Sequence, residues 1–291
     1  MANETELANI IKQTDTVSAM KLEAFTTTDN VWPLIYSEAF DSTTNVKKFR
    51  KGGKLEVANG TESTGYTFGS DSEVTESSVT VTGTRKEVAA KLTLEQLAFS
   101  GAYQSLEDTI KLAFQGFARK AAGELKTLFS SLSGSVTAST TLTKDALLDA
   151  RYIVASGVKN ATLSPRLVGY FDYKGMNELA KELTSVSASA FSNQVDLGGV
   201  LGIATGGKPK GELFDIVLFE TDGLPTDTGD DVAAVWDPAK CFCAGVMSSQ
   251  MPEMWIKNPS ADAPWYEIYM ATFWAIAELA DAAGTRVRSD T

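Results

Sequence analysis

One long amphipathic helix, placed directly after a polar ribbon, constrains this chain more than any other feature. Between residues 106 and 129, apolar side chains recur at spacings of three and four: Leu106, Ile110, Ala113, Phe114, Phe117, Ala121, Leu125, Leu128 and Phe129. This spacing predicts a helix with one buried face, and Ser105 is its expected N-cap. A helix from Leu106 to about Ser130 spans roughly 37 Å. A rod of this length with a ribbon at its start indicates an assembly part more than an enzyme pocket.

Residues 45–101, ahead of this helix, are predicted to form a protruding β-ribbon. The segments 64–68, 73–82 and 85–94 alternate in period two and are rich in Thr, Val and Ser. Large apolar residues are few in them, so the ribbon cannot build a core of its own. We therefore expect the ribbon to gain its stability from contacts elsewhere.

Basic residues gather at the start of this ribbon, although the chain is acidic overall. The chain holds 26 basic and 37 acidic residues, a net charge of −11, so overall attraction cannot hold it on a nucleic acid. The cluster contains Lys47, Lys48, Phe49, Arg50, Lys51 and Lys54. A solvated loop, a contact with an acidic neighbouring subunit and a local nucleic-acid contact all remain open. With Trp32, which lies in an apolar cluster at 31–36, these residues are the candidate subunit-interface residues.

The absence of histidine excludes several kinds of site. No Ser-His-Asp triad, Cys-His pair or His-ligated zinc site is available to a chain without histidine. The two cysteines, Cys241 and Cys243, are too few for a closed zinc site, and we expect them to be core residues on one face of a strand. The sequence therefore predicts no catalytic residue, no metal site and no cofactor.

One loop imitates a nucleotide-binding motif. Gly202, Gly207 and Lys208 match the spacing of a phosphate-binding loop, but Pro209 stands where a Ser or Thr hydroxyl is needed. A strand, rather than the required helix, is expected to follow. The acidic residues at 227–231 match no calcium loop and are interpreted as a solvated turn.

The rest of the chain mixes helices and strands. Residues 134–143 are expected to be a linker, and helices are predicted over 144–156 and 167–183. Strands are predicted over 214–220, 232–236, 241–247 and 266–277. No segment is typical of a secretory signal or a membrane span, so we expect a soluble cytosolic product. A ribbon, a long helix and then mixed elements define the α+β class.

The order of these parts resembles the tailed-phage major capsid protein of the Hong Kong 97 fold. In that fold the arm, the extended loop and the long helix are the N-arm, the E-loop and the spine helix. The run Asp145-Ala146-Leu147-Leu148-Asp149-Ala150-Arg151 is similar to the family's next helix, and Ala161-Thr162-Leu163-Ser164-Pro165 looks like the strand leading into its axial domain. The stretch 197–203 resembles a Gly-rich axial-domain loop, and the strand from Tyr266 resembles the return to the peripheral domain. The resemblance covers most of the chain.

This resemblance implies both a domain order and a function. It implies an N-terminal arm (1–44), an E-loop (45–101), a peripheral domain with the spine helix (102–165), a mainly axial part (166–262) and a return to the peripheral domain (263–291). The implied function is a structural, non-enzymatic shell subunit of a phage virion that assembles with itself in the host cytoplasm. Its implied partners are a separate scaffolding protein, a portal, optionally a decoration protein, and packaged double-stranded DNA without specific binding. An encapsulin-like shell or a phage tail component is the alternative.

Overall fold

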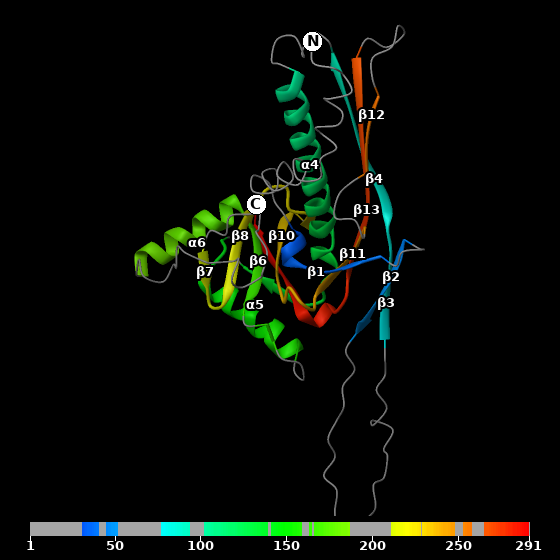
Figure 1. Cartoon of the computed structure of the whole chain (residues 1–291). Helices are drawn as coiled ribbons and strands as arrows, with labels where there is room; N and C mark the ends of the chain where they lie inside the picture. The colour runs from blue at the N-terminus through cyan, green and yellow to red at the C-terminus, as the bar shows by residue number, and fades with distance from the viewer. Residues whose placement is uncertain are drawn as a thin grey trace, which may run out of the picture.

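The computed structural model describes residues 31–40, 45–51, 77–93, 102–138, 141–158, 163–164, 166–186, 211–227, 229–247, 253–257 and 265–290. In these stretches the chain forms two β-sheets, a separate two-stranded ribbon and three α-helices (Figure 1). The α+β class predicted from the sequence is therefore confirmed. In the described residues, no helix is both long enough and apolar enough to span a membrane.

Helix α4 (Ala102–Thr127) is a continuous rod of 26 residues, or about seven turns. Its stripe is buried as predicted: Phe114 is 1 % exposed, Phe117 7 % and Leu125 0 %. The predicted N-cap is wrong, because the helix begins at Ala102 and Ser105 lies inside its first turn. Alanine and glutamine are good helix formers and allow this extra turn.

Two glycines inside α4 do not interrupt the helix. A Cβ atom added to Gly116 or Gly123 meets nothing within 4 Å, so neither glycine is needed for close packing within the chain. Because glycine costs about 1 kcal/mol relative to alanine in a helix interior, Gly116→Ala and Gly123→Ala should each raise the free energy of unfolding by up to about that amount. Urea unfolding of dissociated subunits measures this change. A loss of stability in either variant would contradict the open surroundings.

The first sheet packs on α4 and is built around the long strand β13 (Trp265–Glu278). One edge of β13 pairs with β4 (Thr84–Thr93). The other edge pairs first with β12 (Glu253–Lys257) and then with β11 (Phe242–Val246), and β1 (Tyr36–Ala39) adds to β11 in parallel. The predicted strands 85–94, 241–247 and 266–277 are confirmed to within a residue or so, but β4 belongs to this sheet and does not pair with the ribbon.

The second sheet contains seven strands, with the path β5–β14–β10–β6–β8–β7 and β9 paired to β10. Its strands are β5 (Ser135–Thr137), β6 (Leu167–Asp172), β7 (Gly211–Leu213), β8 (Ile216–Thr221), β9 (Thr226–Asp227), β10 (Asp230–Trp236) and β14 (Gly284–Asp290). The predicted strands 214–220 and 232–236 correspond to β8 and β10, although β8 starts two residues late, after a turn. The predicted linker 134–143 instead contains β5.

The helix predicted over 167–183 is wrong in its first part. Residues 167–172 form the central strand β6, and α6 (Tyr173–Val186) begins only after it. Five consecutive residues of β6 are buried, because this strand has hydrogen-bonded neighbours on both edges and cores on both faces. A continuous apolar run of this kind lacks the alternation that marks a strand. The helix predicted over 144–156 is confirmed as α5 (Lys144–Gly157), capped by the Thr143 side chain.

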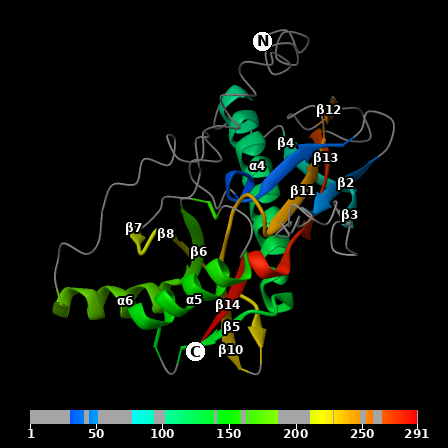
Figure 2. The same cartoon turned by 90° about the horizontal axis from the view of Figure 1, so that it is seen from below.

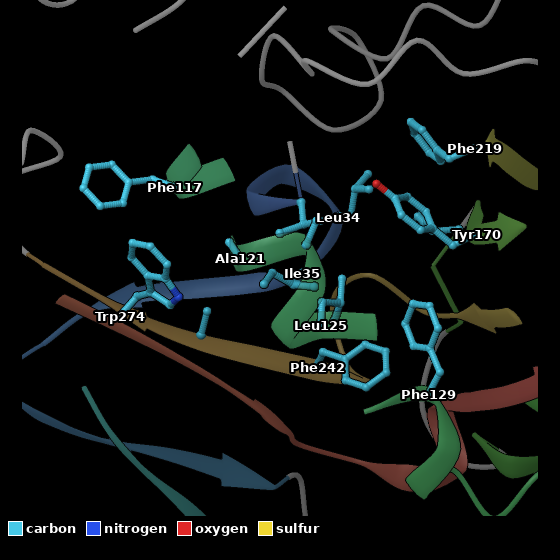
Figure 3. Close-up of a cluster of buried hydrophobic side chains, with 14 of the residues drawn as sticks. Leu34, Ile35, Phe117, Ala121, Leu125, Phe129, Tyr170, Phe219, Phe242 and Trp274 are labelled. Carbon is cyan, nitrogen blue, oxygen red and sulfur yellow. The ribbon is translucent and has the colours of Figure 1, made fainter. Parts of the chain in front are cut away.

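Alternate residues of the seven-stranded sheet enter two separate cores. Tyr170, Phe219 and Trp236 point to the core shared with α4 and the first sheet, where Figure 3 shows Tyr170 between Phe219 and Phe129. Phe171 and Leu218 point to the opposite core. Helices α5 and α6 cover that second face (Figure 2). The middle of the molecule is thus a sheet with apolar packing on both sides.

The described ribbon consists of β2 (Val46–Lys51) and β3 (Ser77–Thr82), which pair in antiparallel fashion. It lies at the edge of the molecule, away from α5 and α6 (Figure 1). The predicted strand 73–82 overlaps β3, whereas the predicted strand 64–68 lies outside the described residues. The last part of the predicted arm is integrated into the body, since Val31, Leu34 and Ile35 are buried in the first core.

Candidate functional site

The ribbon is seated on its own chain by a small apolar cluster. Phe49 of β2 and Val81 of β3 are buried against Cys243 and Leu279, separately from the two larger cores. The Phe49 ring also meets the Tyr36 ring edge to face, with 5.9 Å between centroids. Phe49, a predicted interface residue, therefore packs inside its own subunit. The alternation of β2 consequently turns its neighbours Lys48 and Arg50 to the opposite face.

The basic residues of β2 lie on both faces of the ribbon. Lys47 forms an ion pair with Glu38 at 2.9 Å. A hydrogen bond from Tyr36 and the contact with Lys47 lower the pKa of Glu38, so Glu38 is ionised at neutral pH. Lys48 and Arg50 are exposed and Lys51 is half-buried, while Lys54 lies outside the described residues. The structure thus presents Lys48 and Arg50 on the outer face of the ribbon.

The direction of the ribbon is set by Phe40 and two glycines. A side chain at Gly83, between β3 and β4, or at Gly245 of β11 would overlap the Phe40 ring. In addition, the Gly83 amide donates a 2.6 Å hydrogen bond to the carbonyl oxygen of Asn45. Phe40 therefore holds the point at which the chain passes from the ribbon to the first sheet. No sequence pattern indicates this role, because the three residues meet only after β1 and β11 pair.

Trp32, the other predicted interface residue, packs against the helix side of the first sheet. Its ring meets that of Trp274 edge to face, with centroids 5.8 Å apart. Trp274 donates from Nε1 to Glu124 of α4 at 2.8 Å, and Lys86 of β4 contacts the same carboxylate at 2.6 Å. This network fastens α4 to both long strands. Sequence reasoning missed Glu124, since no local pattern indicates its partners.

The two cysteines are buried thiols, and the described residues form no metal centre. Burial raises the pKa of the Cys241 thiol well above its usual range and that of Cys243 to about 12, so both thiols are protonated at neutral pH. They also lie in different clusters, because β11 begins only at Phe242, and the prediction that they share one face is wrong. No group of three metal-ligating side chains occurs in the described stretches. The Gly202–Lys208 loop lies outside them.

In the acidic turn at 227–231, Asp227 contacts two arginine side chains of β14. Asp227 accepts a hydrogen bond from Arg288 and lies 3.7 Å from Arg286. These contacts bind the turn between β9 and β10 to β14, the neighbouring strand. The carboxylate of Asp227 thus pairs with arginine side chains of the same sheet rather than with a calcium ion.

Comparisons with known proteins identify the fold. No family model matches the chain, and no curated protein matches its sequence. Among solved structures, the capsid of Ralstonia phage GP4 is 9 % identical, with a TM-score of 0.65 over 89 % of this chain and 87 % of that one. The capsid structure of cyanophage P-SCSP1u is 9 % identical, with a TM-score of 0.60 over 89 % and 87 %.

An encapsulin also resembles the chain. The holo-SrpI encapsulin complex of Synechococcus elongatus PCC 7942 is 10 % identical, with a TM-score of 0.59 over 88 % of this chain and 86 % of that one. The chain therefore has the Hong Kong 97-like capsid fold that its sequence resembles. At such low identity the likeness establishes the fold alone.

Proposed function

We propose that this protein is the major capsid protein of a tailed bacteriophage. The observation that carries the proposal is the likeness to capsid structures along almost nine-tenths of both chains. The ribbon supports it, because its described part packs on the body through a small apolar cluster and turns basic side chains outward. Such a subunit is a structural part of the virion, not an enzyme, and it assembles with itself in the host cytoplasm.

In a capsid subunit, the parts of this fold have separate roles. The five-stranded sheet with α4 forms the peripheral part of the subunit, and the seven-stranded sheet with α5 and α6 forms most of its axial part. The ribbon is the base of the E-loop. A scaffolding protein, a portal and optionally a decoration protein are its further partners, and DNA is enclosed without specific binding. A net charge of −11 favours DNA that moves freely past the wall.

Electron micrographs of the purified full-length protein test this function. We expect closed shells, formed either by the protein alone or with its scaffold. Tubes would favour a tail component, and small particles under all conditions would contradict the proposal.

The likeness to an encapsulin favours one second candidate, a shell that encloses a protein cargo. Shells that contain DNA which a nuclease can digest only after the shells are ruptured support the capsid. Shells that co-purify with one stoichiometric cargo protein support the encapsulin.

Reversing the outward charges of the ribbon should impair assembly without unfolding the subunit. In the double variant Lys48→Glu and Arg50→Glu, a neighbouring acidic surface would repel the ribbon. One exposed ion pair contributes only about 0–1 kcal/mol, but a shell repeats each contact in every subunit. Assembly of the wild type should therefore also weaken as salt rises.

Sedimentation measures assembly in this experiment, and circular dichroism monitors the fold. A matched control reverses Lys144 and Lys181, which lie on the helices of the second sheet. We expect the control to assemble like the wild type. Normal assembly of the double variant at both low and high salt would show that these basic residues have no role in assembly.

A further inference from the structure

On the outer face of β4, β13 and β12, the outward side chains of the two edge strands are exposed, whereas Ala271 in the middle of β13 is buried. Ile268 and Met270 of β13 point to the other face, where they are buried in the core that contains α4. Their neighbours Glu267 and Tyr269 point outward, as alternation requires. Figure 1 shows α4 on one side only of these three strands. Farther along the same face of β13, the ribbon covers Ala275 and Ala277, so the exposed part begins where the ribbon ends.

The strand register arranges this outer face in three rows. The first row is basic at both ends, the second is aromatic and the third is acidic at both ends: Lys91, Glu267 and Lys257; Ala89, Tyr269 and Trp255; Glu87, Ala271 and Glu253. We call this surface the three-row face. Successive rows lie about 7 Å apart, two residues along a strand.

The aromatic row is unusually open for its residue types. The exposed fraction is 47 % for Trp255 and 41 % for Tyr269, and the two residues are direct cross-strand partners. The Arg85 guanidinium lies 5.9 Å from the centre of the Trp255 ring. Trp, Tyr and Arg are the residues enriched in the centres of protein–protein interfaces.

The charges of this face are ordered and balanced. Lys257 contacts Glu267 at 3.4 Å and Arg85 contacts Glu87 at 2.8 Å, while Lys91 lies 4.6 Å above the Trp265 ring. Hydrogen bonds from Trp265 and Tyr269 lower the pKa of Glu267 to about 2, so this carboxylate stays ionised. Three cations (Arg85, Lys91, Lys257) and three anions (Glu87, Glu253, Glu267) sum to zero. Two copies of a chain with net charge −11 repel one another on average but not through this neutral face.

We propose that the three-row face is a contact between two copies of this chain. The rows are self-complementary: a two-fold axis that runs along the aromatic row, between the two faces, places Lys91 and Lys257 of one copy opposite Glu87 and Glu253 of the other. An isologous contact needs this property, because the same patch serves both subunits. The aromatic rows then bury one another at the centre, with charged rows at the rim. This inference rests on the proposed function, in which a second copy is the most abundant partner.

The first test removes the aromatic row. The double variant Trp255→Ser and Tyr269→Ser deletes two exposed rings, and its matched control, Leu148→Ser and Tyr152→Ser, deletes two exposed apolar side chains of α5. Because truncated interface aromatics often cost more than 1 kcal/mol, the subunit concentration at half-association should rise about tenfold or more in the first variant. The control should stay near the wild type. An unchanged first variant, or equal loss in both, overturns the proposal.

The second test exchanges the charges. One variant carries Lys91→Glu and Lys257→Glu, and the other carries Glu87→Lys and Glu253→Lys. Each alone should fail to associate through this face, whereas an equimolar mixture should recover. A mixture no better than its components overturns the contact. If Glu87→Lys and Glu253→Lys instead rescue the ribbon variant Lys48→Glu and Arg50→Glu, the ribbon of another copy occupies the face and the two-fold contact is wrong.

Oxidative footprinting of the wild type separates this inference from the proposed function. Trp255 should be oxidised several-fold more slowly in associated protein than in dissociated subunits. Shells in which Trp255 reacts as fast as in free subunits overturn the three-row contact and leave the capsid function standing. Dimers that protect Trp255 without ever forming shells contradict the capsid function and support the contact.

Discussion

Trp236→Ala should lower the free energy of unfolding by about 3–5 kcal/mol, the range for deleting a buried large aromatic side chain. Trp236 is 0 % exposed. Its ring centroid lies 5.5 Å from that of Phe129, 5.6 Å from that of Phe242 and 5.9 Å from that of Tyr170. Deletion would leave a cavity where α4, both sheets and the 31–40 segment meet. Since domains have only about 5–15 kcal/mol of stability, we expect a loss of soluble protein at 37 °C.

A companion variant separates packing from hydrogen bonding at this site. Trp236 Nε1 donates to the carbonyl oxygen of Leu34 at 2.9 Å. Trp236→Phe keeps an aromatic ring but leaves this carbonyl unpaired, which should cost about 1–3 kcal/mol. Urea unfolding of dissociated subunits measures both variants, with the exposed Trp255→Ala as the control. If Trp236→Ala were as stable as Trp255→Ala, the aromatic cluster would not stabilise the fold as described.

Gly157→Ala should destabilise the protein by about 1–3 kcal/mol or more, the range for overpacking a core. Gly157 is the last residue of α5, and a methyl group there would overlap the backbone carbonyl oxygen of Ala282. Unlike a flexible side-chain end, this backbone cannot move aside cheaply. It belongs to the short turn Asp281–Ala283, whose last residue accepts a hydrogen bond from Asp237 through its carbonyl group.

The same substitution on α4 provides the control for Gly157. Gly116→Ala adds the same methyl group into open space and should stabilise the protein. Thermal unfolding of the two variants beside the wild type should therefore give shifts of opposite sign. A Gly157→Ala protein that unfolds at or above the wild-type temperature would show that α5 does not lie as close to this turn as the structure places it.

Local patterns were sufficient for elements that are amphipathic on their own. The stripe of α4 repeats over many turns, so its period stands out clearly, and the residues that interrupt it do not break it. The alternation of β13 is visible because Ile268 and Met270 on one face are buried, whereas Glu267 and Tyr269 on the other are at least partly exposed. The buried run of β6 has no period, and only its position between β8 and β10 makes it a strand. Strands β5, β12 and β14 were missed because pairing with β14 or β13, rather than their own composition, makes them strands.

The candidate interface residues show the same division at the level of single side chains. The sequence identifies a basic cluster on an acidic chain but not which side chains leave the body. Pairing of β2 with β3 and packing over Cys243 turn Phe49 inward and Lys48 and Arg50 outward, and Trp32 is held by Trp274. The three-row face shows this more strongly, because β4 is far in the chain from β12 and β13.

The sequence by itself determined the α+β class, the long helix with its buried face, the basic ribbon start and the lack of histidine chemistry. These follow from composition and from periodicity between near neighbours, which the chain carries in any conformation. Only the tertiary structure decided the two sheets, the hold of Phe40 on Gly83 and Gly245, the Glu124 network and the alignment of charged and aromatic rows. Each of these depends on residues tens or hundreds of positions apart, and their distances are set by strand register and core packing, which no local pattern records.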